Sequence, residues 1–135
     1  MKKIKKIKLK RFLKNTGKLV PIEFNRAFPI KVKRIFFIYG KNKKERGNHA
    51  HKKAYQFFFP VHGKMRLKIR NSNKSISLNL NSISNEGYLV PPGNWCTIKF
   101  VNNNSILLVL SNRNYEKNDY IRNFKKYLNF FRNKK

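Results

Sequence analysis

The sequence predicts an all-β barrel with one amphipathic helix at its C-terminal end. Short apolar runs with turn residues between them follow one another from Arg34 to Leu110, at the even spacing of an antiparallel barrel or sandwich. In the run from Lys64 to Arg70, apolar and charged residues alternate, as in a strand with one buried face. After residue 118 the apolar residues recur every three or four positions, which is typical of a helix.

The first of the clear strands is predicted from Arg34 to Tyr39, where aromatic and β-branched residues are dense, and it ends at Gly40 as a buried strand should. Lys41 to Arg46 is polar and is expected to form a loop. The next strand is predicted from His49 to Val61. Because Pro60 cannot donate a backbone hydrogen bond, that end of the strand is expected at a sheet edge or a β-bulge.

The remaining strands are separated by turn residues. They are predicted at Lys64 to Arg70, Ser75 to Leu80, Gly87 to Val90, Cys96 to Val101 and Ser105 to Leu110. The turns between them fall at His62-Gly63, Asn71 to Lys74 and Pro91-Pro92-Gly93.

The two ends of the chain differ in character. The helix is expected over residues 118–132, with Asn118 or Asp119 placed to cap it and with its apolar side chains lying against the β body. The helical period is carried by Ile121, Phe124, Leu128 and Phe131. Residues 1–14 hold eight Lys or Arg and are expected to form a basic N-terminal strand or arm.

Length and composition indicate one domain, residues 1–135, in a soluble cytoplasmic protein. The single Cys96 excludes an intrachain disulfide, and no apolar run approaches the ~18 residues needed to span a bilayer. The basic start MKKIKKIKLKRFLK is not followed by the apolar segment of a signal peptide, so it is expected to belong to the mature chain.

The formal net charge of +28 leaves two classes of partner open. Clustered Lys and Arg bind nucleic acid by counterion release, so a basic nucleic-acid-binding β-barrel without enzymatic activity is one alternative. The lysines, however, are spread through loops and both termini, and the chain is rich in Asn, Ile and Phe, as an A+T-rich genome would produce. We therefore favour a small anionic ligand such as a diphosphate over nucleic acid.

The candidate chemistry lies in two histidines. The five carboxylates form no obvious pair, and no phosphate-binding glycine motif is present. His49 and His51 stand two positions apart, so on a strand they share one face. Buried imidazoles are costly unless they are used, and they titrate near neutral pH. The third histidine, His62, is expected to be a turn residue beside Gly63.

The histidine segment resembles the first motif of the cupin superfamily, small β-barrels that hold a metal or a small molecule. The motif usually has a metal-binding Glu where this chain has Gln56, and a later His where it has Cys96. We therefore expect a metal-free site in which His49 and His51 are general acid and base. A metal cupin that uses His49, His51 and Cys96 is the alternative.

Nearly the whole chain, from about Gly17 to Leu128, resembles a narrower group, the WxcM-like nucleotide-sugar 3,4-ketoisomerases, which are metal-free cupins acting on dTDP-4-keto-6-deoxy-D-glucose. The segments that carry the resemblance are IKVKRIFFIY (30–39), RGNHAHKKAYQ (46–56), GYLVPPGNW (87–95) and the region 107–122, especially LLVLS and DYIR. The resemblance implies a cupin or jelly-roll barrel that moves a carbonyl from C4 to C3 through an enediol.

The resemblance also implies roles for particular residues. It assigns the transfer of the carbon-bound proton mainly to His49 and a relay between oxygens to His51, with Arg34 and Arg46 binding the diphosphate. Tyr88 and Trp95 are expected either to stack on thymine or sugar or to pack in the core. Gln56, an odd number of positions from either histidine, is expected to be structural unless a bulge intervenes, and Phe36-Phe37 replaces a Tyr-Tyr pair.

The resemblance further implies a homodimer, no cofactor, and a product consumed by a PLP-dependent 3-aminotransferase. Such a product would serve the biosynthesis of a 3-amino-3,6-dideoxyhexose of a bacterial surface glycan.

Overall fold

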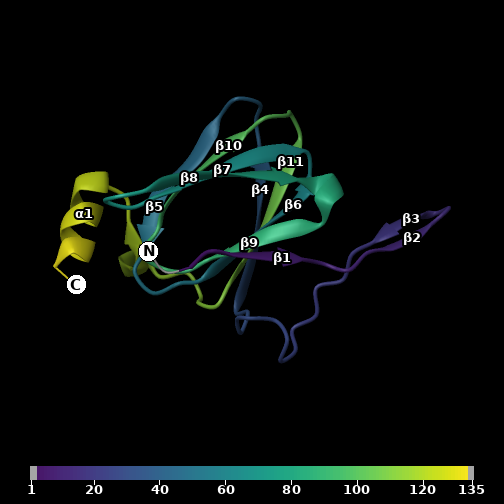
Figure 1. Ribbon diagram of the computed structural model, residues 1–135, viewed down its shortest axis with the longest axis horizontal. Coiled ribbons are helices and arrows are strands. Elements are labelled where there is room, and N and C mark those ends of the chain that lie inside the picture. Colours follow the sequence, from purple (N-terminus) through teal and green to yellow (C-terminus); the bar gives the residue numbers. More distant parts are fainter. Residues whose placement is uncertain (1–2, 134–135) are drawn as a thin grey trace.

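The computed structural model describes residues 3–133 as two five-stranded antiparallel sheets that face each other, with a hairpin and a helix outside them (Figure 1). In order across the first sheet, the strands are β1 (Lys5–Lys8), β9 (Glu86–Val90), β6 (Gln56–His62), β11 (Ser105–Ser111) and β4 (Arg34–Gly40). Those of the second are β12 (Tyr120–Ile121), β5 (Glu45–His51), β10 (Trp95–Phe100), β7 (Lys64–Arg70) and β8 (Ser75–Asn81). The predicted all-β barrel with one C-terminal helix is confirmed.

The main core lies between the two sheets. Leu67 and Ile69 of β7 meet Leu107 and Val109 of β11 there, and all four side chains are fully buried. Each side chain of this kind contributes about 1.5–3 kcal/mol through removal of apolar surface from water. The outer face of the first sheet is covered separately, by the segment 20–32, whose apolar residues pack on Phe57 and other outward-facing residues.

The helix α1 (Phe124–Arg132) begins later than the residue 118 expected from the apolar period. Its N-cap is Asn123, whose side chain accepts a hydrogen bond from the backbone N–H of Lys126, so the predicted caps at Asn118 and Asp119 are wrong. The preceding residues instead form a 3-10 turn (Lys117–Asp119) and then β12, which pairs with β5. Because residues 120–121 pair with β5 as a strand, they are not part of the helix.

The strand predicted from His49 to Val61 is in fact two strands, β5 and β6, which lie in different sheets. The chain turns at residues 52–55 because the carboxylate of Asp119 accepts hydrogen bonds from the backbone N–H groups of Lys53 and Ala54. β5 also begins at Glu45, inside the stretch that was expected to be a loop.

In the first sheet, the burial of β4 differs from the prediction, and the irregularity predicted at Pro60 of β6 is found. β4 was expected to be buried, yet it is the edge strand and its residues alternate, so that Ile35, Phe37 and Tyr39 are exposed on the outer face. Of the two alternatives expected at Pro60, a sheet edge or a β-bulge, the structure shows the bulge, because the pairing of β6 with β11 shifts register between Ile106 and Leu107.

Near the N-terminus, a strand and a projecting hairpin precede the barrel strands. The predicted basic N-terminal element is confirmed in part as β1, at the edge of the first sheet, and it leads into a hairpin of β2 (Phe12–Lys14) and β3 (Gly17–Leu19) that projects away from the body (Figure 1). Residues 1 and 2 lie outside the described residues. No helix among residues 3–133 is long and apolar enough to cross a membrane.

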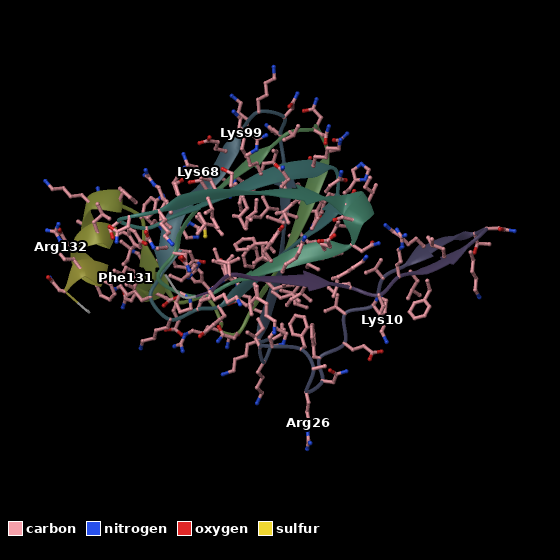
Figure 2. All side chains as sticks on the ribbon, in the orientation of Figure 1. Lys10, Arg26, Lys68, Lys99, Phe131 and Arg132 are labelled. Atoms are coloured by element: carbon pink, nitrogen blue, oxygen red, sulfur yellow. The ribbon has the colours of Figure 1, made fainter. Side chains whose placement is uncertain are left out.

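Basic side chains lie on several sides of the barrel (Figure 2). Lys68 and Lys99 point outward from the second sheet, Arg26 points from the opposite side, and Lys10 lies near the projecting hairpin (Figure 2). A duplex-binding protein concentrates its cations along one face, so this distribution does not favour the nucleic-acid alternative.

Candidate active site

A cavity of about 320 Å³ opens between the two sheets and contains His49. The other residues that line it come from five strands and from the residue after β12: Arg34, Phe36, Phe37 and Ile38 of β4, Arg46 and Gly47 of β5, Gln56 and Phe58 of β6, Cys96 and Ile98 of β10, Tyr120 of β12, and Arg122. The cavity is therefore lined by apolar side chains with a few polar and charged groups among them, as ligand sites usually are.

Local backbone geometry places His49 against β10. Gly47 has a φ of +95°, and the pairing of β5 with β10 shifts register at this point, so that His49 lies opposite Cys96. Asn48 also has a positive φ and its side chain accepts a hydrogen bond from Thr97. Bulges of this kind commonly redirect side chains beside active sites.

His51 is held by a carboxylate that is remote in the sequence. Nδ1 of His51 lies 2.8 Å from Oδ2 of Asp119, and both side chains are buried. Because a carboxylate can only accept a hydrogen bond, Nδ1 of His51 carries the proton. Of the five carboxylates in the chain, all within the described range, Asp119 alone is buried.

The two imidazoles and Tyr120 form one aromatic cluster. The ring centroids of His49 and His51 are 5.1 Å apart, and the Tyr120 ring lies 5.0 Å from the first and 4.4 Å from the second. Tyr120 is placed there by the pairing of β12 with β5, in which it stands opposite His51. The tyrosine therefore packs against both histidines at the wall of the cavity.

Burial keeps both imidazoles neutral. It lowers the pKa of His49 to about 4, with His51 and Arg122 acting in the same direction and the Gly47 backbone opposing them. Burial also lowers the pKa of His51, although the hydrogen bond and charge of Asp119 raise it in part. At neutral pH the site thus contains two imidazoles that are free to accept a proton.

Three arginines give the cavity a positive wall. Arg34, Arg46 and Arg122 all line it. The guanidinium of Arg34 lies 4.5 Å from the Phe36 ring centroid, and that of Arg122 lies 4.4 Å from the Tyr120 ring centroid. These cation–π contacts orient two planar groups whose donors match the oxygens of a phosphate.

The positions that a metal cupin would use carry weaker ligands here. Gln56 lines the cavity after all, because the turn at residues 52–55 places it on a different strand from the histidines. Cys96 lines it too, but burial raises the pKa of the thiol to about 12, so the sulfur keeps its proton at neutral pH. Among residues 3–133 no group of three or more His, Cys, Asp or Glu side chains is arranged to hold a metal ion.

Two of the predicted ligand contacts are not found in the cavity. Trp95 is 4 % exposed and packs against the helix residues Phe124 and Tyr127, so the structure shows the core-packing alternative. Tyr88 of β9 packs beside the core between the sheets and does not line the cavity. His62 is exposed at the end of β6, as expected for a turn residue.

Size alone does not identify the site. A larger groove of about 610 Å³ lies between the helix and the turns at 71–73 and 92–93, and its cations are Lys52 and Arg132. None of the three histidines lines it. The smaller cavity is the chemically equipped one, because it joins an imidazole to three guanidinium groups.

Sequence reasoning missed three of the residues that complete the site: Asp119, Tyr120 and Arg122. They belong to the DYIR segment, which carried part of the family resemblance but was interpreted as the start of a helix. The available signal was that this segment places a carboxylate, a phenol and a guanidinium within four positions.

Comparison with known proteins agrees with this geometry. The family model described as FdtA: WxcM-like, C-terminal matches residues 2–132. A curated relative, the TDP-4-oxo-6-deoxy-alpha-D-glucose-3,4-oxoisomerase of Aneurinibacillus thermoaerophilus, is 34% identical over 128 residues, which cover 92% of this chain and 91% of the relative.

Solved structures show the same likeness. QdtA, a sugar 3,4-ketoisomerase from Thermoanaerobacterium thermosaccharolyticum in complex with TDP, is 28% identical, with a TM-score of 0.90 over 97% of this chain and 96% of that chain. A mutant of the same enzyme in complex with TDP-4-keto-6-deoxyglucose is 27% identical, with a TM-score of 0.89 over 96% of this chain and 94% of that chain. The expected cupin-like barrel is confirmed by these likenesses.

Proposed function

Since the chain belongs to the FdtA family of WxcM-like proteins, we propose that it converts dTDP-4-keto-6-deoxy-D-glucose into the 3-keto sugar by moving the carbonyl from C4 to C3. The chain is an isomerase, as its relatives are. The observation that carries the proposal is the cavity itself, in which a neutral imidazole and three guanidinium groups face one space.

The chemistry of the shift needs one proton carrier near two neighbouring carbons. The C4 ketone acidifies the proton on C3, so a base can remove that proton and leave an enediol; return of a proton to C4 completes the isomerisation. His49, neutral and lining the cavity, is the proposed base for the carbon-bound proton. His51, packed against it, is the proposed helper that relays protons between the two oxygens.

The arginines suit the nucleotide part of the substrate. Arg34 and Arg46 are the proposed ligands of the diphosphate, and Arg122 on the same wall joins them. A planar guanidinium offers paired donors to phosphate oxygens, and hydrogen bonds between charged groups contribute about 1.5–3 kcal/mol each.

We propose that the reaction proceeds without a metal or another cofactor. The support is the donor set: Gln56 supplies a neutral amide and Cys96 a protonated thiol at the positions where metal cupins have a carboxylate and an imidazole. Two imidazoles with such neighbours are poor ligands for a divalent cation.

A homodimer is the proposed assembly. Strand β4 is a sheet edge whose outer residues Ile35, Phe37 and Tyr39 are 50%, 51% and 73% exposed. Phe12 and Leu13 of the projecting hairpin are likewise more than half exposed. An open edge with large apolar side chains favours pairing with another chain, and a second copy supplies a matching surface.

The proposed reaction also suggests the biological setting. A 3-keto nucleotide sugar is a substrate for a PLP-dependent 3-aminotransferase, which would yield a 3-amino-3,6-dideoxyhexose for a surface glycan. We place the enzyme in the cytoplasm, where nucleotide sugars are made and where a buried free thiol such as Cys96 stays reduced.

NMR of the nucleotide sugar formed from dTDP-4-keto-6-deoxyglucose tests the proposal. The wild-type chain is expected to produce the 3-keto isomer and, in D₂O, to exchange the C3 proton. His49→Asn should abolish this exchange, whereas His62→Asn, which alters an exposed turn residue, should leave it unchanged. Recovery of only unexchanged substrate with the wild-type chain would overturn the assignment.

A further inference from the structure

The buried pair of His51 and Asp119 has features that a purely structural contact does not need. Asp119 uses one oxygen, Oδ1, to accept a hydrogen bond from the backbone N–H of Lys53 at 2.7 Å, at the turn between β5 and β6. Its other oxygen receives the Nδ1 proton of His51 at 2.8 Å and lies 3.3 Å from the N–H of Ala54. One carboxylate thus fixes both the backbone turn and the orientation of an imidazole.

Each of the two imidazoles also has one buried nitrogen without a hydrogen-bond partner in the described part of the chain. These atoms are Nδ1 of His49 and Nε2 of His51. The two rings are in edge-to-face contact, with their centroids 5.1 Å apart. Buried polar atoms are nearly always paired, so an unpaired nitrogen on each of two touching rings calls for an explanation, such as a redox or catalytic role.

We propose that Asp119 is a positioning residue for the isomerisation: its carboxylate keeps a proton on Nδ1 of His51, so that Nε2 of His51 is left unprotonated and accepts the proton that His49 releases. This inference rests on the proposed ketoisomerase function. It assigns the two histidines and the aspartate to one relay.

The relay balances in two halves. One ring nitrogen of His49 takes the proton from C3, the electron pair of the broken C–H bond leaves an enediolate with its charge on O4, and the other ring nitrogen of His49 passes its own proton to Nε2 of His51. The His51 imidazolium, whose Nδ1–H still donates to Asp119, gives that proton to O4 and then takes the hydroxyl proton from O3. Return of this proton through His49 to C4 leaves the ketone at C3 and both imidazoles neutral.

Charge distribution favours moving the proton away from His49. The groups that face the pair are Asp119, the cations Arg34, Arg46 and Arg122, and the neutral Tyr120 and Cys96. Only Asp119 is negative, and it touches His51. Burial and Arg122 oppose a positive charge on both rings, and Arg34 also opposes it on His51. A positive charge is still better placed on His51, because only there does a carboxylate in contact favour it, whereas on His49 only the Gly47 backbone does so.

The variant Asp119→Asn distinguishes this role from a structural one. The amide oxygen can still accept from Lys53, but the NH₂ group would face Nδ1 of His51 and donate to it. The proton of His51 would then move to Nε2, where it blocks the relay. The matched control is Glu116→Gln, because Glu116 is an exposed carboxylate three positions earlier that pairs with Arg113.

Two measurements decide the proposal. Nitrogen-15 NMR of the ligand-free wild-type chain should show His51 protonated on Nδ1, and the Asp119→Asn chain should show the proton on Nε2. The rate of C3 proton exchange should fall about 10²-fold or more in Asp119→Asn and stay within twofold in Glu116→Gln. A dTDP-induced rise in melting temperature, retained in both variants, would show that binding and folding persist.

Three outcomes would contradict the relay proposal or the proposed function. A wild-type His51 protonated on Nε2 would overturn the proposal without any variant, even if Asp119→Asn failed to fold. An Asp119→Asn chain that exchanged the C3 proton at half the wild-type rate or faster would overturn it as well. Absence of isomerisation by the wild-type chain would instead reject the proposed function, and the NMR result would still decide the tautomer.

Discussion

The α-carbon of Gly47 packs so closely against the main chain of Cys96 that a Cβ atom at residue 47 would lie 2.9 Å from the Cys96 carbonyl oxygen. The backbone of Gly47 also has a φ of +95°, a region that side chains with a Cβ rarely adopt. This contact sits where the pairing of β5 and β10 shifts register, two residues before His49. The absence of a side chain at Gly47 therefore lets β5, the strand that carries the proposed base His49, lie close to β10.

Gly47→Ala is expected to reduce both stability and activity. The strained φ and the close contact together should cost about 1–3 kcal/mol of unfolding free energy, and displacement of His49 should lower the rate of C3 exchange. Urea unfolding and the exchange assay measure these effects. The control is Gly17→Ala in the hairpin, where φ is also positive but no atom lies within 4 Å of the new Cβ; an equal loss of activity there would argue against the role of the contact.

The activity should be insensitive to pH on the acidic side of neutrality. The base must be neutral to accept a proton, and the pKa of His49 is lowered to about 4, below the ordinary histidine value of about 6.5. Neutral His49 is thus fully present from about pH 8 down to about pH 5, and the rate should fall only as the pH approaches 4. A profile of C3 exchange rate against pH checks this; half-maximal activity near pH 6.5 would contradict the burial argument.

Removal of the cavity arginines should weaken nucleotide binding. Arg34→Ala and Arg46→Ala are each expected to raise the Kd for dTDP about 10- to 100-fold, since a hydrogen bond to a charged group contributes about 1.5–3 kcal/mol. Isothermal titration calorimetry measures the change. Arg26→Ala removes a charge that does not line the cavity and that lies opposite Lys68 and Lys99 (Figure 2), and it should leave the Kd within twofold, which excludes an effect of net charge alone.

The exposed edge strand predicts the assembly state. We expect the wild-type chain to have the mass of a dimer in light scattering coupled to size-exclusion chromatography. Tyr39→Lys places a charge on the outer face of β4, away from the cavity, and should shift the equilibrium toward monomer. Ile83→Lys, which alters an exposed apolar side chain outside β4, should not; a monomeric wild-type chain would contradict the prediction.

How far the sequence predicts this protein depends on the range of the contacts involved. The alternation of Met65, Leu67 and Ile69 correctly identified β7, because side-chain direction in a strand follows from local backbone geometry. By contrast, the strand through His49 and Gln56 was interpreted as continuous. Its interruption depends on hydrogen bonds from Asp119, which stands more than 60 positions away.

The sequence by itself determined the all-β class, the shared face of His49 and His51, and the motifs that identify the family. These follow from periods and spacings within a few residues. Only the tertiary structure decided that Asp119 supports His51, because that contact joins the end of β5 to the segment before the helix across 68 positions. A carboxylate that looks like a helix cap in a one-dimensional pattern becomes a catalytic support only when folding buries it beside an imidazole.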